Sequence, residues 1–304
     1  MKLLLDKAST ISSQTTFGQY APFKNICTIN DAAITHAPIY KDFIPPLKLR
    51  RMSPILKMSL TTAIKCVGKA GDEIGATIIG TGLGCMKDTS SFLLQIKSAT
   101  GDSLSPTSFI HSTHNTVSGQ ISLFFKNHGY NITHSQNNLS FEMSLLDSMN
   151  ILQSNNSINA VLVGASDEKI DFLDNLAGEV ISDHYPITEL SSSFVVRSGN
   201  RATSGRVIID RVCFDYSELE MSSILEKHDI DLNSFDIVLH SNIRSIESNS
   251  RINYLKYSGM NLSASAFACH FAFDLLQRGK GKKALIINNL CSESTGFTFL
   301  SVIE

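Results

Sequence analysis

Apolar side chains recur along this chain at two spacings, one typical of α-helices and the other of β-strands. Residues 140–153 place them three or four positions apart, whereas residues 159–164 form a short, continuous apolar run. Their alternation along the chain indicates an α/β fold with largely buried sheets. The predicted helices span residues 54–71, 89–98, 117–125, 140–153, 218–227 and 264–278, and the predicted strands span 2–12, 73–80, 130–135, 159–164, 194–198, 206–215, 235–240, 283–288 and 296–303.

Part of this pattern occurs twice. Residues 140–164 and 264–288 each contain a helix of about 14 residues, a polar break and an apolar strand. No low-complexity segment or flexible linker separates the copies, which predicts one packed unit over residues 1–304. Its two similar halves would span approximately 1–200 and 201–304, with a shortened C-terminal half. The strands at 194–198 and 206–215 are close enough in sequence to form a β-hairpin.

The composition argues against several classes of function. Of 304 residues, 42% are hydrophobic and 18% are charged, and the formal net charge is −2. We therefore expect no nucleic-acid partner, and without an apolar run of about 18 residues we expect no membrane insertion. Six scattered cysteines without a zinc spacing favour free thiols, no metal and a cytoplasmic location. The glycines of residues 80–84 lack the dinucleotide-binding spacing, so we expect no cofactor.

Several short motifs resemble those of one enzyme family. Residues 105–109 read Ser-Pro-Thr-Ser-Phe, residues 112–119 read Ser-Thr-His-Asn-Thr-Val-Ser-Gly, and residues 159–168 read Asn-Ala-Val-Leu-Val-Gly-Ala-Ser-Asp-Glu. With residues 50–53 and 80–84, they are similar to segments of the β-ketoacyl synthases of the thiolase superfamily. The Ser-Pro-Thr-x-Phe and Ser-Phe-Glu patterns resemble its chain-length-factor branch, which occurs with aryl polyene and flexirubin-type pigment synthesis.

This resemblance implies a thiolase-like fold of five layers, α-β-α-β-α, made from two similar halves. It also implies a dimer in which the strand before the nucleophile pairs across the two-fold axis. In the chain-length-factor branch the other subunit is an active β-ketoacyl synthase, and an acyl carrier protein acts through the complex. Lys48, Arg50, Arg51 and Lys57 form a modest basic cluster, but we expect the carrier to dock mainly on the catalytic partner.

The segment that matches the nucleophile of this family has no thiol. Residues 129–142 resemble the strand, elbow and helix that carry the catalytic cysteine, and the position of that cysteine falls on Asn138. No cysteine lies between Cys85 and Cys213, so a register shift of one or two residues does not supply one. Asparagine is a common helix N-cap, and we expect Asn138 to cap the helix that follows.

The two catalytic histidine positions are also incomplete. His240 matches the first, at the end of a predicted strand, whereas Met260 occupies the second. A thioether can neither donate a hydrogen bond nor carry the positive charge that stabilises an enolate. The sequence therefore predicts a catalytically inactive subunit in which His240 is a structural remnant.

The resemblance implies that such a subunit completes the acyl-chain tunnel of its synthase partner. It places Phe109, Phe141 and Met143 at the tunnel or the dimer interface, as residues that set where the chain stops. His114 and Asn115 lie in a well-matched motif, and we expect them to form a buried pair that holds a loop near this interface.

Three alternatives remain open. Gln136, two residues before the cysteine position, is a minor candidate for malonyl decarboxylation. Ser140 or Cys269 is a candidate nucleophile for an active acyltransferase or thioesterase with a non-standard site. The third alternative is a homodimeric, non-catalytic scaffold without a synthase partner.

Overall fold

Ten strands in the described residues form one sheet that divides into two five-stranded halves. The computed structural model describes residues 1–29, 33–68, 74–98, 104, 106–170, 185–201, 203–241, 243–246, 251–291 and 293–304. The strands follow the spatial order β3-β2-β4-β5-β1-β6-β10-β9-β7-β8. Their bounds are β1 (Leu3–Ile11), β2 (Ala76–Gly80), β3 (Tyr130–His134), β4 (Val161–Asp167), β5 (Leu190–Ser198), β6 (Val207–Asp215), β7 (Ile237–His240), β8 (Arg251–Asn253), β9 (Lys283–Cys291) and β10 (Ser294–Val302).

The two half-sheets are joined where β1 contacts β6. The register there pairs Leu3 with Ile209 and Leu4 with Ile208. In each half the spatial order is third, second, fourth, fifth and first strand of that half. The second strand is parallel to the third and fourth strands in both halves, and the fifth is antiparallel to the fourth. The internal repeat predicted from the sequence is therefore a repeat of the whole half-sheet topology.

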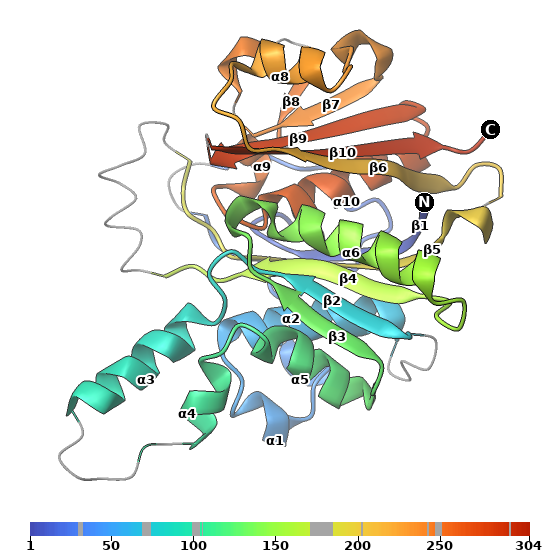
Figure 1. Cartoon of the computed structure of the whole chain (residues 1–304). Helices are drawn as coiled ribbons and strands as arrows, with labels where there is room; N and C mark the ends of the chain where they lie inside the picture. Colours follow the sequence, from blue (N-terminus) through green and yellow to red (C-terminus); the bar gives the residue numbers. More distant parts are fainter. Residues whose placement is uncertain are drawn as a thin grey trace.

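Helices form three layers around the two half-sheets (Figure 1). α6 and α10 lie between the half-sheets, α2 and α5 cover the outer face of the first, and α8 covers the outer face of the second. This is the five-layered α-β-α-β-α fold that the family resemblance implied. The helix bounds are α1 (Pro46–Leu49), α2 (Pro54–Val67), α3 (Met86–Ser98), α4 (Pro106–His111), α5 (Thr116–Phe125), α6 (Ser140–Ser154), α8 (Met221–Lys227), α9 (Leu255–Ser258) and α10 (Ala264–Gln277).

The amino-acid sequence of each helix suits its layer. α10 is apolar on almost every side and is buried along nearly its whole length, because a helix between two sheets has no face toward solvent. α8, in an outer layer, buries only Met221, Ile224 and Leu225. Within the described residues, no helix combines the length and the apolarity that crossing a membrane requires.

The predicted hairpin between residues 194–198 and 206–215 is wrong, although both segments are strands. They belong to β5 and β6, and β1 lies between them, paired with β5 along most of its length. Insertion of β1 buries its apolar residues Leu3, Leu4 and Leu5. Four further elements, α1, α4, β8 and α9, escaped the sequence analysis because lengths of three to six residues are too short for a periodic pattern.

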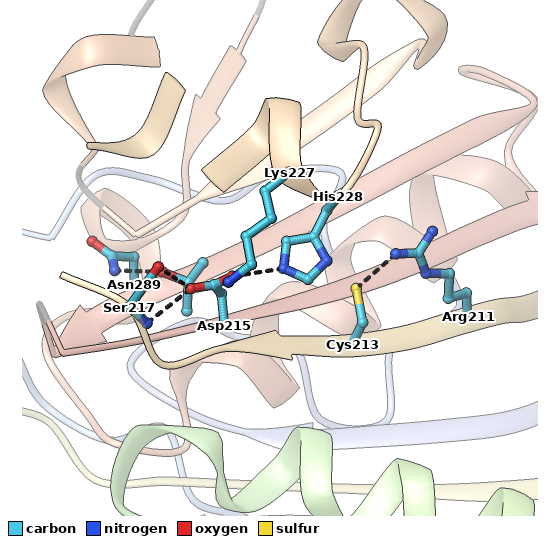
Figure 2. A network of polar contacts seen from close by, with 8 residues as sticks. Arg211, Cys213, Asp215, Ser217, Lys227, His228 and Asn289 are labelled. Carbon is cyan, nitrogen blue, oxygen red and sulfur yellow. Dashed lines mark hydrogen bonds and ion pairs between the residues drawn. The ribbon is translucent and has the colours of Figure 1, made fainter. Parts of the chain in front are cut away.

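A buried carboxylate fastens α8 to the second half-sheet (Figure 2). Asp215, the last residue of β6, accepts a hydrogen bond from the Ser217 backbone N–H at 2.8 Å and another from the Ser217 hydroxyl. Its second oxygen lies 2.8 Å from both Lys227 Nζ and His228 Nε2. Burial works to raise the pKa of Asp215, but the hydrogen bonds from Lys227, Ser217 and His228 outweigh it and hold the pKa below its usual range.

Replacing Asp215 by asparagine should lower the free energy of unfolding by about 1–3 kcal/mol at pH 7, since the surrounding donors lose a charged acceptor. The pKa of Asp215 is lower in the folded state than in the unfolded state. Its contribution to the free energy of unfolding is therefore complete above the unfolded pKa of about 3.9 and is lost as the pH falls through the folded pKa. The difference between variant and wild type, measured by urea unfolding, should therefore shrink below about pH 4.

Asp210→Asn is the matched control, because Asp210 lies in the same strand and its partner Lys2 is 60% exposed. We expect this control to change stability by less than about 1 kcal/mol. Equal losses from the two substitutions at pH 7 would contradict the role given to Asp215.

Candidate functional site

The elbow between β3 and α6 turns at an exposed asparagine. β3 ends at His134, the 3-10 helix η2 spans Asn137–Leu139, and α6 begins at Ser140. Asn137 has a φ of 54°, in the left-handed region, and is exposed at the tip of the turn. The Ser140 hydroxyl closes the turn by accepting a hydrogen bond from the Gln136 N–H at 2.9 Å.

Gly80, the last residue of β2, packs closely against the backbone of the elbow at Ser140. A Cβ atom on Gly80 would lie 2.6 Å from the carbonyl group of Ser140, so a larger residue would push the two segments apart. The Ser140 hydroxyl also lies 2.9 Å from the Thr81 carbonyl oxygen, to which it can donate. The elbow geometry therefore depends on the close approach of Gly80 and on the Ser140 hydroxyl, and neither contact needs a thiol.

Asn138 is buried and bonded to the other half of the molecule. Its side-chain oxygen accepts a hydrogen bond from the Ser294 hydroxyl at 3.0 Å, and its backbone carbonyl accepts one from Asn288 Nδ2 at 2.7 Å. The expectation that Asn138 caps a helix is wrong: Leu139 is the N-cap of α6, and neither η2 nor α6 has a side-chain cap. The amide instead turns to the β9–β10 hairpin, which supplies the partners that a buried amide requires.

A thiol from the second half-sheet does reach the elbow. Burial raises the pKa of Cys291, the last residue of β9, while the Asn138 backbone N–H beside it has the opposite, smaller effect. Glu293 raises the pKa further. Cys291 is therefore a neutral thiol near pH 7, unlike the thiolate that a synthase needs. Linear spacing gives no sign of this contact, which joins residues more than 150 positions apart.

The two histidine positions of the family fall at the end of β7 and shortly before α10. His240 ends β7 and is fully buried, and its Nδ1 accepts a hydrogen bond from the Ile243 N–H at 3.1 Å. The next residue, Ser241, accepts a hydrogen bond from the Asn289 N–H at 2.7 Å. Since Asn289 follows Asn288, which bonds to the elbow, the structure brings His240 to the same end of the sheets as Asn138.

Met260 is half-buried and is held by backbone contacts. Its N–H donates to the Pro186 carbonyl at 2.9 Å, and its carbonyl accepts from the Thr188 N–H at 3.0 Å. These contacts place it just before α10. No hydrogen-bonding group on this side chain could replace an imidazole.

Asp167 connects the Met260 loop to the elbow, a role that the sequence analysis missed. It ends β4 and accepts hydrogen bonds from Thr81 Oγ1 at 2.8 Å, from Ser263 Oγ at 2.6 Å and from the Gly82 and Leu83 N–H groups. Burial raises the pKa of Asp167 despite these donors. An acidic residue directly after a buried apolar strand was the available signal.

Glu142 is a second buried carboxyl beside the elbow. Its Oε1 accepts a hydrogen bond from Asn288 Nδ2 at 2.9 Å, and Asn288 Oδ1 accepts one from the fully buried Tyr254 hydroxyl at 3.4 Å. Burial raises the pKa of Glu142 to about 7, against the lowering effect of Asn288. This carboxyl therefore changes its protonation within the physiological range.

The residues expected at the tunnel or interface fall into two environments. Phe109, on α4, is 58% exposed, whereas Phe141 is buried in the central core against Phe194, with ring centroids 5.4 Å apart. Met143 is half-buried. The expectation that His114 and Asn115 form a buried pair is wrong, because both are exposed. The His114 ring packs over Gly84, where a Cβ would come within 2.6 Å of its Cδ2 atom.

The alternative nucleophiles are poorly placed for chemistry. Cys269 is fully buried in α10, and burial raises the pKa of its thiol. Ser140 is also fully buried and is engaged in the turn, whereas Gln136 is exposed. Among the described residues, no group of three or more histidine, cysteine or acidic side chains is arranged to hold a metal ion.

Replacing Glu142 by glutamine should remove a pH dependence of folding. The unfolded carboxyl ionises near pH 4.5 while the folded one stays protonated to about 7, so its contribution to stability falls as the pH rises between these values. The variant should match the wild type near pH 5 and exceed its stability at pH 8, by up to about 3 kcal/mol. Urea unfolding at both values checks this.

Glu226→Gln, on the exposed surface of α8, is the control and should show no such trend. A Glu142→Gln variant that is less stable than the wild type at pH 8 would mean that the folded state holds an ionised, well-bonded carboxylate there.

Comparison with known proteins identifies a family model that matches this chain. A family model described as the β-ketoacyl synthase N-terminal domain matches residues 25–176, which is 152 of 304 residues. No curated protein sequence matches the chain.

Solved structures similar to the whole chain include a chain of the ishigamide ketosynthase/chain length factor, with 12% identity, a TM-score of 0.77 and 100% of both chains covered. A second belongs to the ketosynthase ApeO in complex with its chain length factor ApeC from Xenorhabdus doucetiae, with 11% identity, a TM-score of 0.72, and 99% and 98% covered. A third, from the complex AntDE:AntF, has 14% identity, a TM-score of 0.74 and 99% of both chains covered. Since the family model matches half of the chain and the layered fold agrees with it, this chain belongs to the β-ketoacyl synthase family.

Proposed function

We propose that this chain is a chain length factor: a catalytically inactive, cytoplasmic subunit that pairs with an active β-ketoacyl synthase and shapes its acyl-chain tunnel. The elbow itself carries the proposal. An active synthase needs a thiolate at this turn, and here the turn presents Asn137 and the buried Asn138. Met260 likewise stands where an imidazole is required, so neither acyl-enzyme formation nor enolate stabilisation has its usual group.

The surface beside the elbow suits a partner subunit. β3 is an edge strand of the first half-sheet, and an unpaired strand edge is a template for another strand. α3 and α4 project from the body next to it (Figure 1). This arm exposes Phe109 and Ile110, at 58% and 55%, and α3 buries no residue among its described positions. Such an apolar surface favours burial in an interface.

The similar structures support the same pairing. Two of them join a ketosynthase with a chain length factor, and a third joins a ketosynthase with an acyl-carrier protein. Their identities of 11–14% show likeness of fold alone, so the pairing of this chain is our inference.

We infer a polyene or polyketide-type pathway, of the aryl polyene or flexirubin kind, from two sequence patterns. Ser-Pro-Thr-x-Phe ends at the exposed Phe109 of α4, and Ser-Phe-Glu forms the buried start of α6. An acyl carrier protein would act through the complex, mainly on the catalytic subunit. The basic cluster on this chain is small, and Lys48 already lies over the Phe124 ring at 5.2 Å.

One observation favours a second function. The Cys291 thiol lies beside the Asn138 N–H, so a thioester could exchange there: the Cys291 sulfur would bond to the acyl carbon, and the carrier thiol would leave with the proton. The raised pKa of Cys291 argues against this acyl transfer.

Charged substitutions on the arm should prevent assembly with the synthase. We expect Phe109→Glu and Ile110→Glu to reduce co-elution of the co-expressed subunits in size-exclusion chromatography, because a buried, unpaired charge opposes association. Wild-type chain expressed alone should be poorly soluble, since its strand edge stays open.

Leu219→Glu is the matched control, because Leu219 is 51% exposed and precedes α8 in the second half. It should leave co-elution unchanged. Unaltered co-elution of the two arm variants, or a soluble homodimer of the wild-type chain, would favour the homodimeric scaffold instead.

Smaller side chains at the tunnel positions should lengthen the product. In a reconstituted system, we expect Phe109→Ala and Met143→Ala to shift the product distribution by at least one extension unit, because removing a wall group opens space for the growing chain. Phe141→Ala is unsuitable, since truncating this core residue would cost about 3–5 kcal/mol of stability. Leu219→Ala should leave product length unchanged, and an unchanged distribution in both test variants would refute the gating role.

A further inference from the structure

A pocket lies at the edge of β1, away from the elbow. β1 pairs with β6 only near Leu3 and Leu4, and beyond these residues its edge is free of β6. The pocket has a volume of about 270 Å³ and is lined by β1, by the segment after it, by the end of α2 and by the last turns of α10. Asp274 of α10 lines it, about ten residues or roughly 15 Å along the helix from the end that meets the elbow network.

The pocket lining contains two lysines. Lys7 and Lys65 line it, and both act to lower the pKa of the Cys66 thiol, which places both of them in the neighbourhood of that residue. Within the described residues, neither lysine has an ion-pair partner.

The acidic residues of the lining are already neutralised. Asp6 pairs with Arg197 at 3.2 Å and with Arg206 at 2.5 Å. Asp274 pairs with Arg278 at 2.6 Å. The two lysines are therefore left to attract an anion from solution.

A buried hydroxyl in the pocket wall has no partner. Ser9, on β1, is 3% exposed, and its oxygen makes no hydrogen bond within the described part of the chain. Leaving a buried hydroxyl unpaired costs free energy that a ligand oxygen could recover. Beside it, burial lowers the pKa of His270 to about 3, so the ring is neutral at pH 7, and its Nδ1 lies 2.8 Å from Thr10 Oγ1.

We propose that this pocket binds a small molecule with one carboxylate or phosphate group and a short apolar body. Lys7 and Lys65 hold the anionic group, and the Ser9 hydroxyl donates a hydrogen bond to one of its oxygens. Ala8, Pro22 and Phe273 line the remaining wall and suit a short hydrocarbon chain. The volume lies just below the usual range of about 300–1,000 Å³ for ligand pockets, so it suits a small molecule better than a nucleotide or a long acyl chain.

Isothermal titration of the full chain, purified alone or together with its co-expressed synthase, with butyrate and with inorganic phosphate, each at constant ionic strength set with chloride, tests the site. The wild type should bind at least one probe saturably, and the stronger probe identifies the anion. The Lys7→Met/Lys65→Met double variant should bind about tenfold more weakly or worse, and Ser9→Ala about threefold more weakly, as expected for lost charged and neutral hydrogen bonds.

Lys41→Met is the matched control, because Lys41 is exposed and lies outside the lining. It should leave binding unchanged, and none of the variants should alter co-elution with a synthase, which separates this test from that of the proposed function. Equal affinity of the double variant and the wild type would overturn the proposal. So would the absence of saturable binding of both probes by the wild type up to about 10 mM, a range in which a specific site should be detected.

Discussion

The structure depends on one constraint: two half-sheets share a single, buried helical layer. Buried polar groups at the starts of α6 and α10 are therefore stabilised by partners within the protein, and among the described side chains of these starts only the buried atoms Glu142 Oε2 and Ser265 Oγ make no hydrogen bond. Asp167 collects donors from the loop after β2 and from Ser263, and Asn288 bonds to both Asn138 and Glu142 across the halves. These contacts fix the elbow without a catalytic thiol. The fold and the shape of the elbow thus do not depend on a thiol at this position.

The spacing of apolar residues predicted most helices and strands, because a helix or strand with a buried face needs apolar residues at regular positions along its own sequence. The repeat of helix and strand in residues 140–164 and 264–288 likewise predicted the duplicated topology. The pairing of β5 with β1 rather than β6 could not be predicted, because β1 lies at the other end of this half of the sequence. The hydrophobic pattern of a strand shows which face is buried but not which strand pairs with it.

Only those features of the site that lie within a single segment of the sequence could be predicted. The sequence shows that the segment matched to the nucleophile has no cysteine, and the structure places Asn137 and Asn138 at its turn. It does not show that Asn138 bonds to Ser294 or that Cys291 lies beside its N–H, because both contacts join opposite halves. Exposure of His114 and Asn115 was also missed, since a short sequence motif does not show how deeply its residues are buried.

The central claim is that this chain forms no acyl-enzyme intermediate. Incubation of the purified full chain with an acyl thioester, followed by intact-mass measurement and peptide mapping, tests it most directly. The account predicts no adduct on residues 135–140 or on Cys291, with only slow labelling of the exposed Cys27. A stoichiometric acyl adduct that survives a Cys27→Ser substitution and disappears in Cys291→Ser would contradict the account and make this chain an acyltransferase with a relocated nucleophile.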